Sequence, residues 1–276
     1  MTYFGVLLRF VVPAVILLTM LEFTINRPRR GPVKGTEGSS HAYWIVAVHV
    51  LLALLYTTPW DNYLVATSVW WYDSALVTGL FLGYVPIEEY TFFIAQTLLA
   101  GFWILLLMRS GLSHWPAPVT PRRKLRIGLT LVAGVVWLAS AIILSAGWQG
   151  GTYLALILVW ALPPMMLQFA FGADILLANW RLILPAVLVP TIYLWVVDYL
   201  AINSGTWTIS PDQTTGIALG VLPIEEMLFF LVTNLLVGLG IPLMLHSTSR
   251  LRAQEWRKRL SGGYRQTDHE TTHAAE

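Results

Sequence analysis

The chain has 276 residues, of which 56% are hydrophobic and 12% are charged, and its formal net charge at pH 7 is +2. Because a soluble domain carries about 25% charged residues, this chain could not cover its own surface in water. The composition therefore excludes a soluble enzyme, a nucleic-acid-binding protein and a disordered linker protein, and it indicates an integral membrane protein.

Apolar segments long enough to cross a bilayer recur along the chain. A membrane-spanning helix needs about 20 mostly apolar residues, whereas barrel strands would alternate apolar and polar residues. The runs are continuous, so we predict an all-α membrane protein with seven transmembrane helices, at about residues 3–25, 42–60, 75–108, 126–147, 152–177, 182–200 and 215–245. The third and seventh segments exceed one span and contain Pro86 and Pro223, which predicts a kink or break inside them.

The basic residues indicate an orientation. All Lys and Arg residues except Arg9 lie after the first, third, fifth or seventh span. Because cytoplasmic loops carry the excess of Lys and Arg, we expect the N-terminus outside the cell and the C-terminus in the cytoplasm. Residues 248–276 are polar and basic, and we expect them to form a disordered cytoplasmic tail.

The sequence repeats itself at an interval of 137 residues. VPIEEYTFF (85–93) aligns with LPIEEMLFF (222–230) without a gap. Further aligned pairs are Asp61 with Asp198, Trp70 with Trp207, Gly79 with Gly216, Gly83 with Gly220 and, at a slightly different interval, Tyr3 with Tyr153. Such self-similarity predicts two three-helix repeats, residues 1–110 and 151–247, joined by a linker (111–150) with a connector helix. Because each unit has three spans and one further span connects them, both units have the same orientation in the membrane, so the repeat is parallel.

Four glutamates, Glu88, Glu89, Glu225 and Glu226, lie within apolar segments. Each ionised carboxylate in a membrane helix costs about 3 kcal/mol on insertion scales, and a carboxylic acid beside a carboxylate forms a general acid/base pair. We therefore predict that these glutamates are catalytic. Adjacent helical residues project about 100° apart, so one of each pair can face a site while the other bonds to polar groups at the helix break. The alternative is that all four cap broken helices or bridge the two units.

Other residues of the repeat are candidate supporting groups. Asp61 and Asp198 end their predicted helices, where a solvated terminus is the simplest interpretation of each, but their repetition favours a shared role in orienting a glutamate. Gln96 and Asn234 lie on the glutamate helices and are expected hydrogen-bond partners. Aromatic residues that could line an apolar site and stabilise a cation through their π faces are Trp70, Trp207, Phe92, Phe93, Phe229 and Phe230. Core packing is the simpler interpretation of any single phenylalanine.

Several cofactor chemistries lack the residues that they need. No G-x-G-x-x-G follows a strand, so no dinucleotide-binding signature is present. The lysines are Lys34, Lys124 and Lys258, all outside the predicted spans, which excludes a retinal Schiff base. The spans have no histidine cluster and no spaced aspartate-rich pair for a metal. We expect neither a cofactor nor a metal.

The duplicated P-I-E-E motif within three-helix units resembles the membrane-integral lycopene cyclases of the heterodimeric type, here with the two subunits fused in one chain. The resemblance covers about residues 1–245, and Pro86–Glu89 and Pro223–Glu226 match the functional motifs of the family. It implies a lycopene beta-cyclase of carotenoid biosynthesis, an isomerase (intramolecular lyase) that forms beta-carotene through gamma-carotene. A glutamate would protonate an end group of lycopene, the end group would close into a ring, and a carboxylate would remove a proton, without a redox step.

The resemblance also implies that the protein lies in a bacterial or archaeal cell membrane. The implied partners are membrane lipid and a hydrophobic carotenoid, with other carotenoid-pathway enzymes as candidate associates and no nucleic acid. We favour one composite site between the repeats, with two independent sites as the alternative. Other functions compatible with the sequence are a C50 carotenoid cyclase, a carotenoid hydratase and a proton-coupled transporter in which the glutamates act as relay groups.

Overall fold

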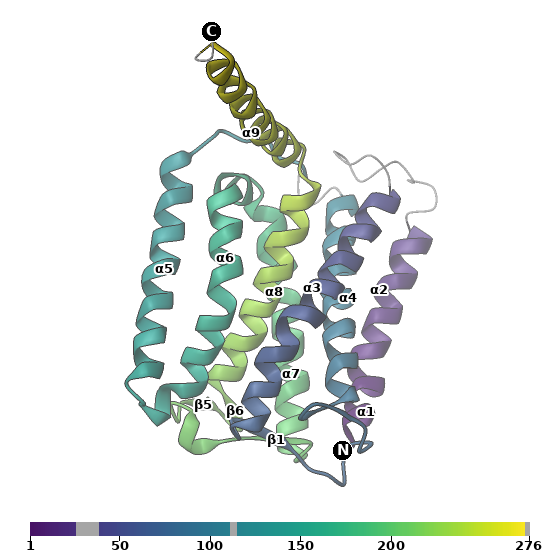
Figure 1. Cartoon of the computed structure of the whole chain (residues 1–276). Helices are drawn as coiled ribbons and strands as arrows, with labels where there is room; N and C mark the ends of the chain where they lie inside the picture. Colours follow the sequence, from purple (N-terminus) through teal and green to yellow (C-terminus); the bar gives the residue numbers. More distant parts are fainter. Residues whose placement is uncertain (26–38, 111–114, 274–276) are drawn as a thin grey trace.

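The structure is a computed structural model that describes residues 1–25, 39–110 and 115–273. Within these residues seven helical spans are long and apolar enough to cross a membrane, and they lie side by side in one bundle (Figure 1). The first span consists of α1 (Tyr3–Val6), a π-helical segment (Leu7–Val11) and α2 (Val12–Ile25). The others are α3 (Ser39–Ala66), α4 (Ile87–Ser110), α5 (Arg123–Ser145), α6 (Thr152–Ala178), α7 (Trp180–Asn203) and α8 (Ile224–Leu245). The prediction of an all-α membrane protein with seven transmembrane helices is confirmed.

Short hairpins lie where a kink or break was expected inside the third and seventh predicted spans. β2 (Phe81–Leu82) pairs with β3 (Val85–Pro86), and β5 (Ala218–Leu219) pairs with β6 (Leu222–Pro223). Gly83 and Gly220 turn the two hairpins with φ angles of +71° and +63°, a backbone region that glycine adopts readily. Proline lacks an N–H group and is best accommodated in the first turn of a helix or directly before it, and α4 and α8 begin directly after Pro86 and Pro223. Of the two expected alternatives, the third and seventh segments are therefore broken at these prolines, and neither contains a kinked helix that continues through them.

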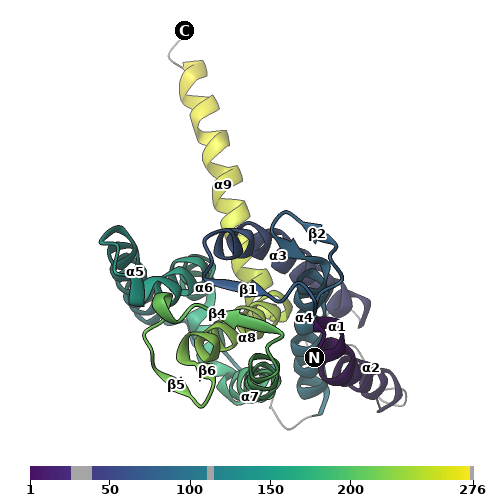
Figure 2. The same ribbon diagram turned by 90° about the horizontal axis from the view of Figure 1, so that it is seen from below.

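Two further strands join the halves of the chain. β1 (Trp70–Tyr72) pairs antiparallel with β4 (Trp207–Ile209), and Trp71 lies opposite Thr208. These two residues are 137 positions apart, so each is paired with its own counterpart in the repeat. Figure 2 shows the two strands side by side across one end of the bundle. Pairing of equivalent positions is what an approximate two-fold axis between two units produces.

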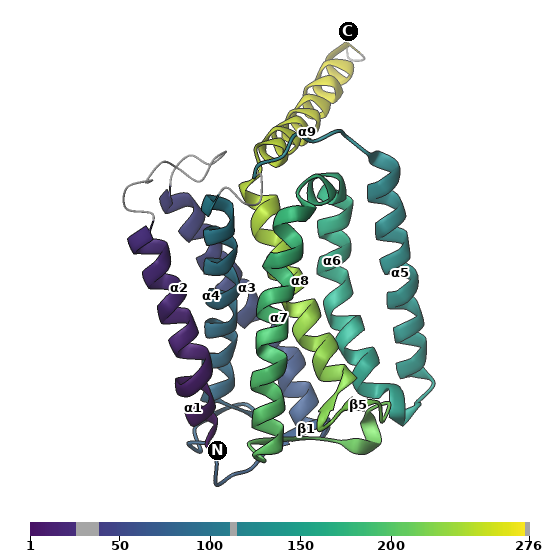
Figure 3. The same cartoon turned by 180° about the vertical axis from the view of Figure 1, so that it is seen from behind.

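The helices that carry the glutamates lie at the centre of the bundle. In the most apolar stretches of α4 and α8, 67% and 61% of the residues are buried, compared with 11% in α5. α7 packs beside α8 on the face seen in Figure 3, and α5 packs at the edge of the bundle against α6 (Figure 1). Large apolar side chains of α5, such as Leu131 and Val135, point outward, as expected for a helix that faces lipid.

The C-terminal segment differs from the disordered tail that its polarity predicts. α9 (Ser247–His273) continues beyond α8 and projects from the end of the bundle opposite the N-terminus (Figure 1). Opposite charges spaced four residues apart, as at Glu255 and Arg259, favour a helix.

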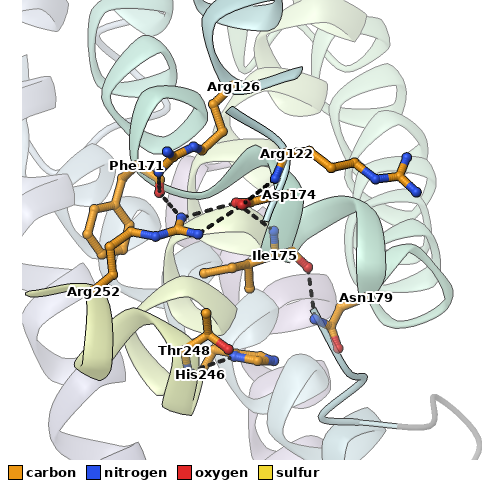
Figure 4. A network of polar contacts seen from close by, with 9 residues as sticks. All are labelled: Arg122, Arg126, Phe171, Asp174, Ile175, Asn179, His246, Thr248 and Arg252. Carbon is orange, nitrogen blue, oxygen red and sulfur yellow. Dashed lines mark hydrogen bonds and ion pairs between the residues drawn. The ribbon is translucent and has the colours of Figure 1, made fainter. Parts of the chain in front are cut away.

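A polar network ties the first turns of α9 to the bundle (Figure 4). Arg252 forms an ion pair with Asp174 of α6, with 2.8 Å between Nη2 and Oδ2, and it also donates to the carbonyl oxygen of Phe171. The backbone N–H of Arg122, which precedes α5, donates to Asp174 Oδ2 at 3.2 Å. One buried carboxylate thus connects α6, the start of α5 and α9.

Candidate functional site

The first glutamate of each pair holds a hairpin. Glu88 Oε1 accepts a hydrogen bond of 2.6 Å from the backbone N–H of Thr78. Glu225 Oε1 accepts hydrogen bonds of 2.7 Å from both the backbone N–H and the hydroxyl of Thr215. Thr78 and Thr215 are equivalent in the repeat and precede the two hairpins. Both glutamates are buried in the first turns of α4 and α8, where the partial positive charge of a helix N-terminus stabilises a carboxylate.

The second glutamate of each pair faces a cavity between the two halves. Glu89 Oε2 accepts hydrogen bonds from the hydroxyls of Tyr3, at 2.5 Å, and Tyr72, at 3.0 Å. Glu226 Oε1 accepts one from the hydroxyl of Tyr153, at 2.6 Å. Both carboxylates line the same cavity. One glutamate of each pair thus faces the cavity and the other bonds to the preceding turn, which is the arrangement that the angular spacing of adjacent residues predicts.

Three tyrosines are site residues that the sequence reasoning did not select. Tyr3 and Tyr153 align with one another in the repeat, and this alignment is the feature of the sequence that could have identified them as site residues. Tyr72 aligns with Ile209 and therefore gave no such signal. Tyr72 lies on β1, outside the membrane-spanning helices, and burial together with the negative charge of Glu89 raises its pKa well above the usual value. Its hydroxyl therefore stays protonated and acts as a hydrogen-bond donor.

Two aspartates complete a buried acidic cluster. Asp61 and Asp198 are 0% and 1% exposed, so the solvated helix terminus expected for each is wrong. The reason is that α3 and α7 continue past them for more than a turn. Asp198 Oδ1 accepts a hydrogen bond of 3.0 Å from Trp207 Nε1, whereas neither oxygen of Asp61 has a partner among the described residues. Among the residues that the structure describes, neither aspartate is hydrogen-bonded to a glutamate.

The cavity between Glu89 and Glu226 has a volume of about 40 Å³, which is room for about one water molecule. Apart from these glutamates and Asp198, its lining is aromatic and aliphatic, and none of the described residues that line it is Lys, Arg or His. Five of the six aromatic residues predicted for the site line it, namely Trp70, Trp207, Phe92, Phe229 and Phe230. Chemically, the cavity offers two carboxyl groups surrounded by apolar and π surfaces.

A second cavity of about 360 Å³ lies beside the first, between α3, α4, α6 and α8. Phe229 lines both cavities, whereas Phe93, the sixth predicted aromatic residue, lines only the second. The side chains of Leu52 and Leu167 at its margin are 53% and 73% exposed. Because these leucines are on the outer surface of a membrane bundle, the second cavity adjoins lipid.

The two predicted amide partners of the glutamates bond elsewhere. Gln96 Nε2 donates to Thr233 Oγ1 at 2.7 Å, and Asn234 Nδ2 donates to Thr191 Oγ1 at 3.2 Å and to the carbonyl oxygen of Phe230 at 2.8 Å. Each amide lies about two helical turns beyond its glutamates, which is too far for a direct bond. These residues instead connect α4 to α8 and α8 to α7.

Two acidic residues elsewhere in the spans form ion pairs with arginines. Asp174 is paired with Arg252, and Glu22 with Arg109 at 2.8 Å. Among the described residues, none that lines the cavity beside the acidic cluster is a Lys, Arg or His that could play this part. Nowhere in the described ranges do three or more His, Cys, Asp or Glu side chains form a group that could hold a metal ion.

Comparison with known proteins shows relatives over most of the chain. The family model described as lycopene cyclase matches residues 35–107 and 150–244, two segments on either side of α5. A lycopene beta-cyclase of Halobacterium salinarum is 41% identical over 207 residues, which cover 75% of this chain and 84% of the relative. A bifunctional lycopene cyclase/phytoene synthase of Phaeosphaeria nodorum is 35% identical over 243 residues, which cover 84% of this chain and 39% of the relative. No solved structure matches the chain.

Proposed function

The chain belongs to the lycopene cyclase family, and we propose on this basis that it is a lycopene beta-cyclase that closes rings in the cavity between Glu89 and Glu226. Membership makes it a membrane enzyme of the intramolecular lyase or isomerase class that acts on a hydrophobic carotenoid. The proposal adds the ring type, the site and the roles of individual side chains.

The proposed reaction moves protons and carbon–carbon bonds without a change of oxidation state. A carboxylic acid protonates C2 of the acyclic end group and leaves a tertiary cation at C1. The C5=C6 double bond attacks C1, so that the C1–C6 bond forms and the cation moves to C5. A carboxylate then removes the proton from C6, and the electron pair of that C–H bond forms the C5=C6 double bond of the beta-ring. One site must therefore hold a proton donor and a proton acceptor.

The observation that carries the proposal is that Glu89 and Glu226, from equivalent helices, line one cavity whose described lining residues include no Lys, Arg or His. Two carboxyl groups that share a buried site do not readily both ionise, so one of them keeps a proton. This favours one composite site over two independent ones. Glu88 and Glu225 hold the hairpins that place the first turns of α4 and α8, and in this proposal they position the acid/base pair without taking part in proton transfer.

The aromatic lining suits a carbocation. Trp70, Phe229 and Phe230 surround the carboxyl groups, and aromatic faces attract cations electrostatically. The apolar walls also keep bulk water away from the cation. The same walls favour cyclisation over hydration, in which water would trap the cation.

The substrate path follows from the two cavities. A volume of about 40 Å³ is far smaller than a carotenoid end group, so the inner cavity must widen when substrate binds. The second cavity adjoins it at Phe229 and faces lipid at Leu52 and Leu167. We propose that lycopene enters sideways from the membrane through this second cavity and that its end group passes Phe229.

The proposed topology has the hairpins outside the cell and α9 in the cytoplasm. The N-terminus and the hairpins lie at one end of the bundle and α9 lies at the other (Figure 1). The Lys and Arg residues lie between alternate spans and in α9, and such residues favour the cytoplasmic side. We further propose residues 1–110 and 151–247 as the two repeats and 111–150, with α5, as their connector.

The test is the pigment content of a lycopene-accumulating bacterial host that expresses the chain. We expect the wild type to form beta-carotene and gamma-carotene. Glu89→Gln and Glu226→Gln, at equal membrane levels, should lose beta-ring formation. Glu255→Gln on α9 is the matched control and should behave as the wild type. Unchanged lycopene in cells with well-inserted wild-type protein would contradict the proposal and direct attention to a C50 substrate.

A further inference from the structure

The two facing glutamates differ in one hydrogen-bond donor. Tyr3 and Tyr153 occupy equivalent places and bond to Glu89 and Glu226 at 2.5 and 2.6 Å. Glu89 has the additional donor Tyr72, at 3.0 Å on the same oxygen. The repeat places Ile209 at the position of Tyr72, and an isoleucine side chain has no donor. The otherwise similar halves are therefore unequal at the carboxyl groups.

The strand pair that spans the axis adds a second difference. Tyr72 on β1 lies opposite Trp207 on β4. Trp207 Nε1 donates to Asp198, whereas Nε1 of its counterpart Trp70 has no partner among the described residues. In the first half the extra donor reaches the glutamate, and in the second half it reaches the aspartate. The extra donor therefore stabilises a negative charge on Glu89 but gives no such support to Glu226.

This distribution separates the roles of the two glutamates. A carboxylate that accepts two O–H donors is stabilised in its ionised form. Glu226 has one such donor, and Asp198 lines the cavity with it. The proton that the two glutamates share therefore resides on Glu226.

We propose that Tyr72 is a positioning residue that holds Glu89 as the base, while Glu226 is the acid that starts cyclisation. This assignment rests on the proposed function. Glu226 gives its proton to C2, and Glu89 takes the proton from C6. The proton then returns from Glu89 to Glu226 across the cavity that both line, so each ring leaves the enzyme in its starting state.

The assignment gives Tyr72 control over ring type. The C5 cation has removable protons on C6, on C4 and on the methyl carbon bound to C5. Loss of the C6 proton gives a beta-ring, loss of a C4 proton gives an epsilon-ring, and loss of a methyl proton gives a gamma-ring with an exocyclic double bond. Because these protons lie close together, the direction in which Glu89 is held decides which of them leaves.

The experiment compares Tyr72→Phe with Tyr153→Phe in the lycopene-accumulating host at equal membrane levels, with ring types separated by chromatography. Tyr72→Phe should still consume lycopene, with less than a tenfold loss, but at least a tenth of its rings should be of the epsilon or gamma type. Tyr153→Phe should slow lycopene consumption and keep beta-rings only. Glu226→Gln should leave lycopene unreacted, whereas Glu89→Gln should enrich epsilon- or gamma-rings among the few that form.

Beta-rings alone from Tyr72→Phe would overturn the role of Tyr72. Abnormal rings from Glu226→Gln, with unreacted lycopene from Glu89→Gln, would reverse the acid and base. If Tyr72→Phe does not reach the membrane, Ile209→Tyr decides the question. That change gives Glu226 a second donor and should slow turnover severalfold with unchanged ring type, and unchanged turnover would count against the assignment. If the wild type forms no rings, that result would instead contradict the proposed function itself.

Discussion

The hydroxyl of Tyr3 lies 2.5 Å from Oε2 of Glu89, although the two residues are 86 positions apart. The backbone N–H of Tyr3 also donates to the carbonyl oxygen of Leu76, in the loop before α4. The start of the first span is therefore attached both to the loop and to the carboxylate. The site depends on long-range contacts of this kind, and its properties can be tested one side chain at a time.

Tyr153→Phe should slow lycopene consumption by about tenfold or more. The change removes the hydroxyl donor of Glu226, and a hydrogen bond to a charged or reacting group is worth about 1.5–3 kcal/mol. Initial rates in membranes with equal protein content measure the effect. Tyr193→Phe is the control, because that hydroxyl donates to the carbonyl oxygen of Phe10 at an exposed position away from the cavity. Equal rates for the two variants would contradict a role for Tyr153.

Glu225→Gln should keep most of the activity, whereas Glu225→Ala should destabilise the protein by about 1–3 kcal/mol. The amide oxygen of Gln can still accept from Thr215, but Ala leaves the donors of the hairpin without their acceptor. Thermal unfolding in detergent, measured beside turnover, separates the two effects. Abolished turnover in a fully stable Glu225→Gln variant would instead assign Glu225 to proton transfer.

Ala53→Trp should reduce lycopene conversion while leaving the protein folded. The larger side chain fills part of the second cavity, through which we propose that substrate enters. Val135→Trp on the lipid-facing side of α5 is the matched control, since Val135 is 68% exposed. Conversion at the wild-type rate by Ala53→Trp would exclude this entry path.

Arg252→Met should lower the thermal midpoint through loss of the ion pair with Asp174. Both side chains are buried, at 11% and 0% exposure, and removal of one partner of a buried pair costs about 3–5 kcal/mol because the other charge stays behind. The double variant with Asp174→Asn should therefore lose less than the sum of the two single variants. Additive losses would mean that the two side chains do not interact, and Arg257→Met, at an exposed position on α9, controls for loss of charge.

Single cysteines should report the orientation, because the chain has no cysteine of its own. Ser74→Cys lies in an exposed loop at the hairpin end, and Gln254→Cys lies in an exposed position of α9. A membrane-impermeant thiol reagent should label Ser74→Cys in intact cells and Gln254→Cys only after the cells are opened. The reverse pattern would invert the proposed topology.

The spans, the repeat and the buried glutamates could be predicted from the sequence, because each is visible as a local pattern of residues. Apolar runs of the right length predict helices, and four carboxylates in such runs stand out. Helix geometry also predicts that one glutamate of each pair faces a site, and in the structure Glu89 and Glu226 line the cavity while Glu88 and Glu225 do not. Which member of each pair does so could not be predicted.

The remaining features depend on contacts that a single sequence does not display. Pro86 and Pro223 end hairpins because flanking glycines turn the chain before the helix starts, which hydropathy alone does not distinguish from a kinked span. Asp61 is buried because α3 continues past it. Tyr72 reaches Glu89 only because β1 crosses the end of the bundle.

Trp71 and Thr208 occupy equivalent positions in the two repeats and pair with each other. This pairing bears on how such a chain arose and on how it can be divided into two polypeptides. Strands that meet at equivalent positions form an isologous contact, the kind that two identical chains make in a symmetric dimer. α5 is the least buried span and lies outside both segments that match the family. A three-helix ancestor could therefore have worked as a dimer before fusion, and the two halves of this chain, produced as separate polypeptides, should reassemble through the same pair of strands.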